Sequence, residues 1–264
     1  MRRNISIRSA IPSDLAALTT IDLLANSSHP LIAHSFPYPF LASKLFLAHL
    51  GYCFSHPQTY KFRVAVLAPP SPPPPDSHSG ADVFAGEGSK APIVGFLLWK
   101  EAEEAGSQRE EPWHWEEKLP PGTDKRLWRE YVQVMGRQPA PAPSSRSPIE
   151  IEKFAVAPAY QRRGIGTRLL QSFVDEIDER GTADRICMRS SVKGRALYER
   201  FEWAVEKEYR MDLRAWGRQR AYVDFDMSRE KVVRSGEERS GEPLGKLGCL
   251  HLASSRTETS HEWQ

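Results

Sequence analysis

A glycine-rich turn between a strand and a helix is the segment whose residue types and spacing point most directly to chemistry. It reads Gln161-Arg-Arg-Gly-Ile-Gly166, follows a strand that ends at Val156, and precedes an amphipathic helix over 164–180. Its two glycines lack a Cβ, so the backbone can approach a ligand closely. The first N–H groups of a helix lack intrahelical partners and carry partial positive charge, and the two arginines add full charge beside them. The turn therefore predicts a cradle for a diphosphate.

Two other diphosphate-binding turns fit this segment less well. The dinucleotide fingerprint Gly-x-Gly-x-x-Gly requires a third glycine, and Leu169 stands at that position. A P-loop requires Gly-Lys-Ser/Thr, and this tripeptide does not follow the turn. The residues therefore disfavour NAD and ATP as ligands. A nucleotide-dependent Rossmann enzyme stays as an alternative interpretation.

Two motifs at a family-like spacing resemble those of the GNAT superfamily, the GCN5-related N-acetyltransferases of fungal and bacterial type. Residues 161–166 are similar to the family signature Gln/Arg-x-x-Gly-x-Gly/Ala, and Phe154-Ala-Val-Ala-Pro158 is similar to its strand-to-turn lead-in. Beyond the next strand, Ser190–Trp203 is similar to the second cofactor segment, which commonly reads Ser-x-x-Gly-x-x-Leu-Tyr-x-x-x-Gly-Phe. The resemblance covers about residues 3–214, interrupted by two inserts.

The second motif departs from the family pattern at three places. Glu202 stands where Gly is usual, and Trp203 stands where Phe is usual. Ser190 or Ser191 occupies the place where many members carry Asn. We expect the glutamate to alter the turn, whereas the tryptophan keeps an aromatic plug there.

The resemblance implies an α/β fold, the GNAT acyl-CoA N-acyltransferase fold. Such a fold has a mixed, mostly antiparallel twisted sheet of about seven strands, flanked by about four helices, with a V-shaped opening between the fourth and fifth strands. From the apolar residues alone, strands are expected at about 5–10, 61–68, 93–100, 149–156, 184–190 and 203–213. Helices are expected at about 12–25, 41–52, 124–137, 164–180 and 192–201.

The resemblance also implies acetyl-CoA as cosubstrate. Backbone N–H groups of the turn are expected to hold the CoA pyrophosphate, and the preceding strand is expected to pair with the pantetheine arm as if with an added strand. Tyr198 matches the tyrosine that many members place near the thioester sulfur, where a phenol can protonate or orient the departing thiolate. A tyrosine that only fills the helix–sheet interface is the alternative. The expected cofactor-binding residues are Phe154, Ala155, Val156, Gln161, Arg162, Arg163, Gly164, Ile165, Gly166, Thr167, Ser191 and Tyr198.

Two glutamates on the strand before the turn are candidates for the base that deprotonates an acceptor amine. Glu150 matches, counted back from the turn, the position where histone-type family members carry a glutamate base. Glu152 is the second candidate, and the period of two places both side chains on one face of a regular strand, which a bulge would change. Solvated carboxylates on an exposed face are the alternative reading of both residues.

The sequence thus predicts an N-acetyltransferase in which a primary amine attacks acetyl-CoA directly. The acceptor, a small molecule or a protein amine, is not specified by any residue. The uncertain base and Glu202 keep a second function open, a catalytically impaired module that binds acyl-CoA or regulates a partner.

Composition gives no argument for several other partners. The formal net charge of +2 does not favour nucleic acid, and the cysteines and histidines lack metal-ligand spacing, so no metal is expected. The basic N-terminus lacks the apolar run of a secretory signal, and the longest apolar stretch, 40–54, is interrupted by Lys44 and His49. We therefore expect no membrane partner and a cytoplasmic or nucleocytoplasmic location. The oligomeric state is not predicted.

One domain is expected over residues 1–216. It is interrupted by a Pro/Ser-rich, disordered insert at about 69–91 and by a partly helical insert at about 101–148. Residues 217–264 are charged and rich in Ser and Gly, which predicts a disordered tail.

Two aromatic groups are further candidates for the acceptor side of the site. Phe36, Tyr38 and Phe40 occupy the segment from which the family often builds the acceptor-side wall. In the second insert, Trp113, Trp115, Trp128 and Tyr131 either line an acceptor pocket or pack the insert helix onto the domain.

Overall fold

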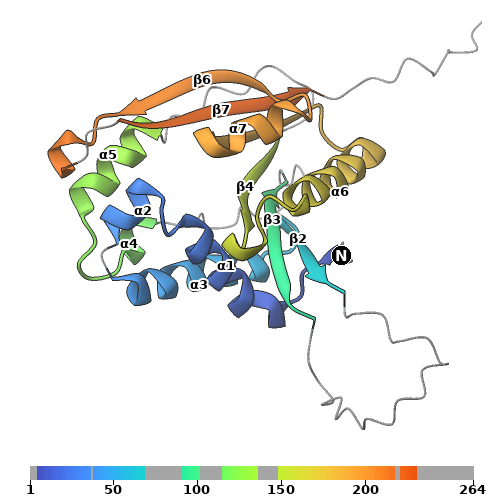
Figure 1. The fold of residues 1–264 in the computed structure, drawn as a ribbon, viewed down its shortest axis with the longest axis horizontal. Helices are drawn as coiled ribbons and strands as arrows, with labels where there is room; N and C mark the ends of the chain where they lie inside the picture. The colour runs from blue at the N-terminus through green and yellow to red at the C-terminus, as the bar shows by residue number, and fades with distance from the viewer. Residues whose placement is uncertain are drawn as a thin grey trace, which may run out of the picture. The chain divides into compact units, whose positions relative to one another are not determined.

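Seven strands form one mixed sheet in the order β1-β2-β3-β4-β5-β7-β6 (Figure 1). The computed structural model describes residues 5–36, 38–68, 91–101, 115–135, 148–217 and 221–230, all within one unit, Met1–Val232. The strands are β1 Ile5–Ser9, β2 Tyr60–Leu67, β3 Ile93–Lys100, β4 Ile149–Val156, β5 Arg185–Ser191, β6 Ala204–Met211 and β7 Tyr222–Glu230. Neighbouring strands are antiparallel except β4 and β5, which are parallel. The predicted α/β fold class is confirmed.

The parallel pair β4 and β5 is joined over a short length only. Three residue pairs connect the strands, Ile149 with Ile186, Glu150 with Cys187 and Ile151 with Met188. The pairing does not continue into residues 152–156 of β4 or 189–191 of β5, and both segments line a cleft. The V-shaped opening expected between the fourth and fifth strands is therefore present.

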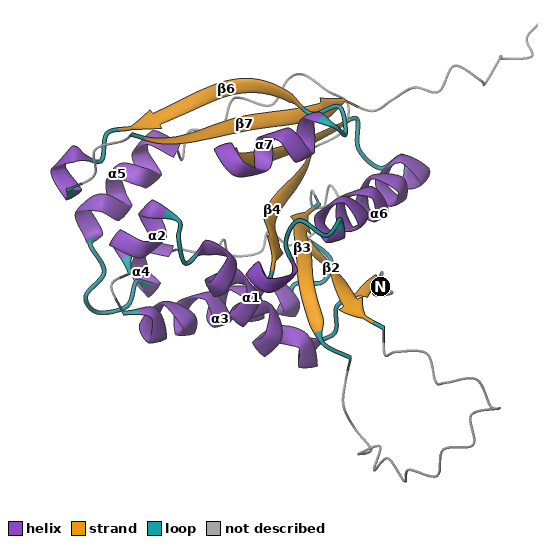
Figure 2. Cartoon of the chain, in the orientation of Figure 1, coloured by secondary structure: helices purple, strands orange, loops and turns teal. Residues whose placement is uncertain are grey.

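Helices pack on both faces of the sheet (Figure 2). Their bounds are α1 Leu15–Asn26, α2 Pro30–Ser35, α3 Pro39–Ser55, α4 Trp115–Lys118, α5 Lys125–Met135, α6 Ile165–Arg180 and α7 Val192–Glu199. The sequence predicts all of these except α2 and α4. His29-Pro30 reads as a helix end, yet Pro30 starts α2, because proline fits the first turn, where its missing N–H needs no partner. No helix in the described parts of the chain has the length and apolar character that membrane crossing requires.

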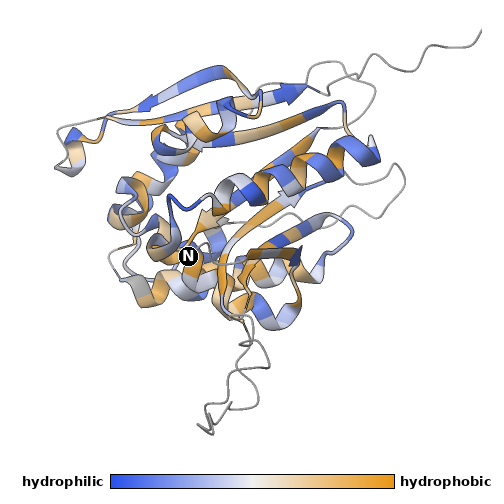
Figure 3. Cartoon of the chain, turned by 45° about the vertical axis from the view of Figure 1, so that its right-hand side comes forward, coloured by the Kyte–Doolittle hydropathy of each residue, from blue (hydrophilic) through white to orange (hydrophobic). Residues whose placement is uncertain are grey.

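The alternation of side chains in β2 and β3 divides the core between the two faces. Phe96 and Leu98 of β3 pack with the apolar residues of α1 and α3. Leu97 and Trp99 point the other way and pack with α6, whose buried stripe includes Phe173. Figure 3 shows hydrophilic and hydrophobic segments alternating along the ribbon of α6, as expected for an amphipathic helix on a sheet. The helix that follows the glycine-rich turn is thus held firmly against the sheet.

The strand β7 corrects the prediction that residues 217–264 form a disordered tail, because residues 222–230 pair with both β5 and β6. Every second residue here is polar, which lowers the hydropathy of the segment. The polar side chains of Asp224, Asp226, Ser228 and Arg229 are nevertheless buried. Asp226 forms an ion pair with Arg189, and Arg229 forms one with Asp178. Partners far away in sequence make this burial possible, and composition does not reveal them. The tail beyond 230, residues 69–90 and parts of the second insert lie outside the described residues.

Candidate functional site

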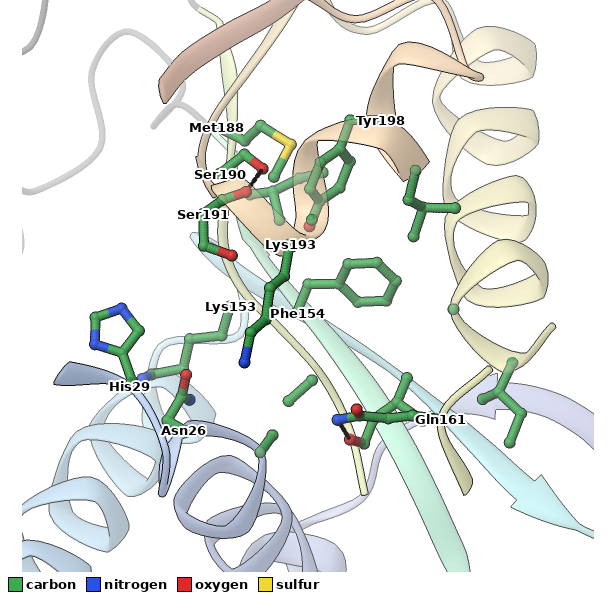
Figure 4. A pocket seen from close by; sticks show the side chains of 18 of the residues that line it. Asn26, His29, Lys153, Phe154, Gln161, Met188, Ser190, Ser191, Lys193 and Tyr198 are labelled. Carbon is green, nitrogen blue, oxygen red and sulfur yellow. Dashed lines mark hydrogen bonds between the residues drawn. The ribbon is translucent and has the colours of Figure 1, made fainter. Parts of the chain in front are cut away.

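A cleft of about 1260 Å³ opens where β4 and β5 separate (Figure 4). One wall comes from residues 151–156 of β4 and from the glycine-rich turn that follows. The opposite wall comes from residues 188–191 of β5 and from α7. The C-terminal end of α1 and the strand β7 complete the cleft.

The glycine-rich turn holds two residues in the left-handed region. Arg162 has φ 60° and Gly164, the N-cap of α6, has φ 79°. Left-handed residues next to right-handed ones gather successive N–H groups into a concave row that suits an anion. A Cβ on Gly164 would meet no atom within 4 Å, so this glycine serves the backbone angle. A Cβ on Gly166 would lie 3.4 Å from side-chain carbons of Leu197 and Phe154, on the cleft side of the helix.

The structure brings eleven of the twelve predicted cofactor-binding residues to the cleft. The exception is Arg163, whose guanidinium lies 5.6 Å from the ring centroid of Tyr160 and does not line the cleft. Gln161 Nε2 donates a hydrogen bond to the Val156 carbonyl at 2.9 Å, so part of the open β4 edge is occupied by the turn itself.

Tyr198 projects from α7 into the cleft and is 6% exposed. Its ring lies 6.0 Å from that of Phe154 and 6.1 Å from that of Trp203. Burial raises the pKa of the Tyr198 phenol well above its usual value. The phenol therefore stays protonated at neutral pH and can donate a proton or a hydrogen bond.

The turn after α7 keeps a glycine-type backbone although it contains a glutamate. Glu202 has φ 68°, and its N–H donates to the Glu199 carbonyl at 3.2 Å. The next residue, Trp203, is buried beside Tyr198, and its N–H donates to the Tyr198 carbonyl. The aromatic plug expected from the sequence is thus present, and the strain of the left-handed conformation falls on Glu202.

A bulge in β4 separates the two candidate bases. Leu98 pairs with Lys153 and the next β3 residue, Trp99, pairs with Ile151, so Glu152 is the extra residue on β4. Glu152 lines the cleft, whereas Glu150 does not. The sequence allows for such a bulge without locating it, because the pairing partner sets its position.

The surroundings of Glu152 raise its affinity for a proton. Burial, and then the nearby charge of Glu150, raise the pKa of the Glu152 carboxyl to about 6, although the side chain keeps 24% exposure. His49 Nε2 lies 4.0 Å from Glu152 Oε2. Burial and the charge of Lys153 lower the pKa of His49 to about 3, so this imidazole is neutral and the contact is not an ion pair. Glu152 is thus a carboxylate that gains a proton easily.

Two groups close to Glu152 were not anticipated from the sequence. Lys153 Nζ lies 2.8 Å from Asp22 Oδ2, in an ion pair that joins β4 to α1. Cys53 Sγ lies 3.7 Å from His49 Nε2, but burial raises the pKa of this thiol strongly, so it is not a nucleophile. Neither position belongs to a motif, and only the packing of α1 and α3 against β4 reveals them.

A second polar group, at the other end of the cleft, combines α1–α2, α5 and β7. His29 Nε2 lies 2.8 Å from the Tyr222 hydroxyl, which donates to Asp224 Oδ2 at 2.5 Å. The ring of Tyr131 lies 6.4 Å from that of Tyr222. Burial raises the pKa of Asp224 to about 6, against the opposing effects of Tyr222 and Arg189. The sequence missed this group because Tyr222 and Asp224 fall in the segment predicted as tail.

The aromatic candidates for an acceptor wall divide between cleft and core. Tyr131 lines the cleft, whereas Trp128 packs edge-on against Phe36 at 5.4 Å. Tyr38 and Phe40 are exposed and do not line the cleft. Trp113 and the side chain of Trp115 lie outside the described residues. Within the described residues, no group of three His, Cys, Asp or Glu side chains could hold a metal ion.

Comparison with known proteins identifies the fold. Residues 126–212 match the family model described as an acetyltransferase (GNAT) domain. A comparison with curated protein sequences finds no significant match. Among solved structures, the histone acetyltransferase HPA2 and related acetyltransferase of Corynebacterium glutamicum is 15% identical with a TM-score of 0.51, over 88% of this chain and 98% of that one. This likeness shows the fold.

Two further solved structures are similar at lower scores. The PaiA N-acetyltransferase of Thermoplasma acidophilum, in complex with coenzyme A, is 14% identical with a TM-score of 0.49, over 86% of this chain and 99% of that one. The spermidine N-acetyltransferase of Vibrio cholerae, in complex with CoA and spermine, is 13% identical with a TM-score of 0.47, over 86% and 95%.

Proposed function

We propose, from the premise that this chain belongs to the GNAT superfamily of acetyltransferases, that it transfers an acetyl group from acetyl-CoA to a primary amine. The observation that carries the proposal is the separation of β4 and β5. It brings the glycine-rich turn, Tyr198 and Glu152 to the walls of one cleft. These are the three parts that a direct acyl transfer needs: an anion cradle, a proton donor and a base.

The cofactor would lie along the glycine-rich turn and the open edge of β4. The N–H groups of residues 162–167 suit the pyrophosphate, and Arg162, Arg168 and Arg200 also line the cleft. Residues 154–156 pair with β3 on one side, and their other edge, which β5 does not reach, suits the amide groups of pantetheine in place of the missing strand. Gln161 would then release the Val156 carbonyl.

Each step of the proposed reaction has a protein group. The Glu152 carboxylate accepts a proton from the amine, whose nitrogen forms a bond to the acetyl carbonyl carbon. The bond from that carbon to sulfur breaks, and the Tyr198 hydroxyl donates a proton or a hydrogen bond to the departing thiolate. Holding amine and thioester together can supply about 7–11 kcal/mol of the barrier reduction. In this scheme Glu150 acts through its charge, which raises the pKa of Glu152.

The test is CoA thiol release from acetyl-CoA with a panel of amines. We expect release with at least one amine class, and binding of CoA but not of NAD in calorimetry. The alternative function, an acyl-CoA-binding module without turnover, is favoured if CoA binds and no amine promotes release. The feature that supports this alternative is Glu202, which stands where the second motif usually has glycine. If bulky replacements of both Gly164 and Gly166 left the affinity for CoA unchanged, the assignment of the cradle would be wrong.

A further inference from the structure

We infer that the cleft end formed by His29, Tyr131, Tyr222 and Asp224 binds a second, non-reacting cationic group of the acceptor. The acceptor class is then an aliphatic amine that carries two positive charges. The inference rests on the proposed acetyl transfer, because it concerns the same cleft. All four residues line that cleft, on elements other than the glycine-rich turn.

The hydrogen bonds of this group fix which atoms carry protons. The Tyr222 hydroxyl has one proton, and it donates that proton to Asp224 Oδ2 at 2.5 Å. At its oxygen it can then only accept, so the 2.8 Å contact with His29 requires a proton on His29 Nε2. Because burial lowers the pKa of His29 to about 4, the imidazole is neutral and Nδ1 carries a bare lone pair.

Two acceptor atoms in this group lack a donor among the described residues. They are Asp224 Oδ1 and His29 Nδ1, and both are buried. Asp224 as a whole is 3% exposed. A buried acceptor without a donor is costly, so a ligand that supplies N–H groups is favoured at this place. An ammonium has three such donors and no acceptor, whereas a carboxylate has none.

The aromatic rings beside Asp224 also suit a cation. The rings of Tyr131 and Tyr222 meet edge to face, with centroids 6.4 Å apart, and the His29 ring lies 5.0 Å from that of Tyr222. Ring faces attract cations, and the attraction grows when water is excluded. A buried carboxylate bordered by tyrosines therefore supplies both charge and apolar contact for an alkylammonium.

Cations also line the cleft near this group. Arg189, the cation beside Asp224, is engaged by Asp226 at 2.9 Å, and its guanidinium lies over the Tyr209 ring. Lys193 lines the cleft from α7, and although it is exposed, its charge is close enough to His29 to help lower the pKa of that imidazole. Glu152 and Asp224 line the same cleft, and the inference assigns one nitrogen of the acceptor to each carboxylate.

The test compares matched amines on the wild-type chain. Diaminopropane, putrescine and cadaverine are each paired with the monoamine of the same carbon chain, and KM is measured by CoA thiol release. A charge-assisted hydrogen bond contributes about 1.5–3 kcal/mol, so we expect one diamine to have a KM roughly 10- to 100-fold below that of its monoamine. Equal KM values within each pair would overturn the inference and leave the acetyl transfer standing.

Variants and a binding measurement separate the remaining outcomes. Asp224→Asn should remove the preference for the diamine, because the amide has no charge for an ammonium, although its oxygen can still accept from Tyr222. Asp212→Asn, an exposed carboxylate outside the cleft, is the matched control and should keep the preference. If no amine promotes release, calorimetry with CoA present decides. If the diamine then binds more tightly than its monoamine, the result supports the subsite and contradicts the proposed activity. If the two amines bind equally, both the subsite and the activity are overturned.

Discussion

The pH dependence of acetyl transfer is predicted to depend on Glu152. Its carboxyl has a pKa of about 6, so its ionised fraction rises about tenfold between about pH 5 and about pH 7. As the base it must be ionised, so kcat/KM should rise with pH through this window. Glu152→Gln removes the base, and a positioned acid or base typically contributes about 10²- to 10⁴-fold. We expect a loss of that size in kcat. The pH profile of the variant should also lack the rise of kcat/KM centred near pH 6.

Glu150→Gln is the matched control for this prediction. It changes the same residue type two positions earlier on β4, outside the cleft. Since the charge of Glu150 raises the pKa of Glu152, its removal should move the acid limb to lower pH and keep most of the rate. The assay is CoA thiol release across pH, with one amine for all variants so that the amine's own ionisation cancels in the comparison. If Glu150→Gln abolishes turnover while Glu152→Gln keeps it, the assignment is reversed. If neither variant changes the profile, neither glutamate is the base.

The raised pKa of Glu152 also predicts a change in stability with pH. This change is opposite to that of the activity, because stability should fall where activity rises. A carboxyl whose pKa is raised on folding binds its proton more tightly in the folded state, so stability decreases as pH rises from the usual value through about 6. Glu152→Gln should therefore have a higher Tm than the wild type at about pH 7, and the difference should shrink at about pH 5. A Tm difference that grows toward low pH would contradict the raised pKa.

Three further predictions concern the elements around the cleft. Glu202→Gly should stabilise the protein by about 1 kcal/mol, because the left-handed conformation costs a residue with a Cβ about 1–2 kcal/mol and the freer unfolded chain offsets part of this. Thermal denaturation measures the change, and Glu202→Ala, which keeps the Cβ, should show no such gain. Gly166→Leu should weaken CoA binding at least about tenfold in calorimetry, whereas Gly166→Ala, whose Cβ fits between Leu197 and Phe154, should keep the fold and most of the affinity. Lys153→Met should lower the free energy of unfolding by about 3 kcal/mol, because Asp22, 3% exposed, loses its ion-pair partner. Urea denaturation measures that loss, and a variant with both Lys153→Met and Asp22→Asn should recover part of it.

The cleft wall to which we assign the cofactor could be predicted from the sequence because local rules govern its elements. Gly164 and Gly166 mark a turn before an amphipathic helix, and Tyr198 follows at helical spacing from the N-cap of α7. The positive φ of Arg162 could not be predicted in this way, since arginine does not favour that conformation.

The acceptor side could not be predicted because long-range contacts create it. Glu152 and Glu150 look equivalent in sequence, and only the register of β4 against β3 separates them. Asp224 looks like a residue of a charged tail until β7 pairs with β5 and β6. Pairings between distant segments, which no single-sequence pattern records, thus decide which carboxylates line the cleft.

The separation of β4 and β5 also predicts how the protein behaves on storage. Beyond Ile151, β4 presents backbone N–H and C=O groups that β5 does not pair, in effect a free sheet edge inside the fold. Such an edge can pair with any extended chain, including that of another molecule, and Gln161 covers only the Val156 carbonyl. A pantetheine arm bound there would occupy the edge and block that pairing. The cofactor would then protect the protein against self-association, and preparations without CoA should aggregate faster on storage than preparations saturated with it.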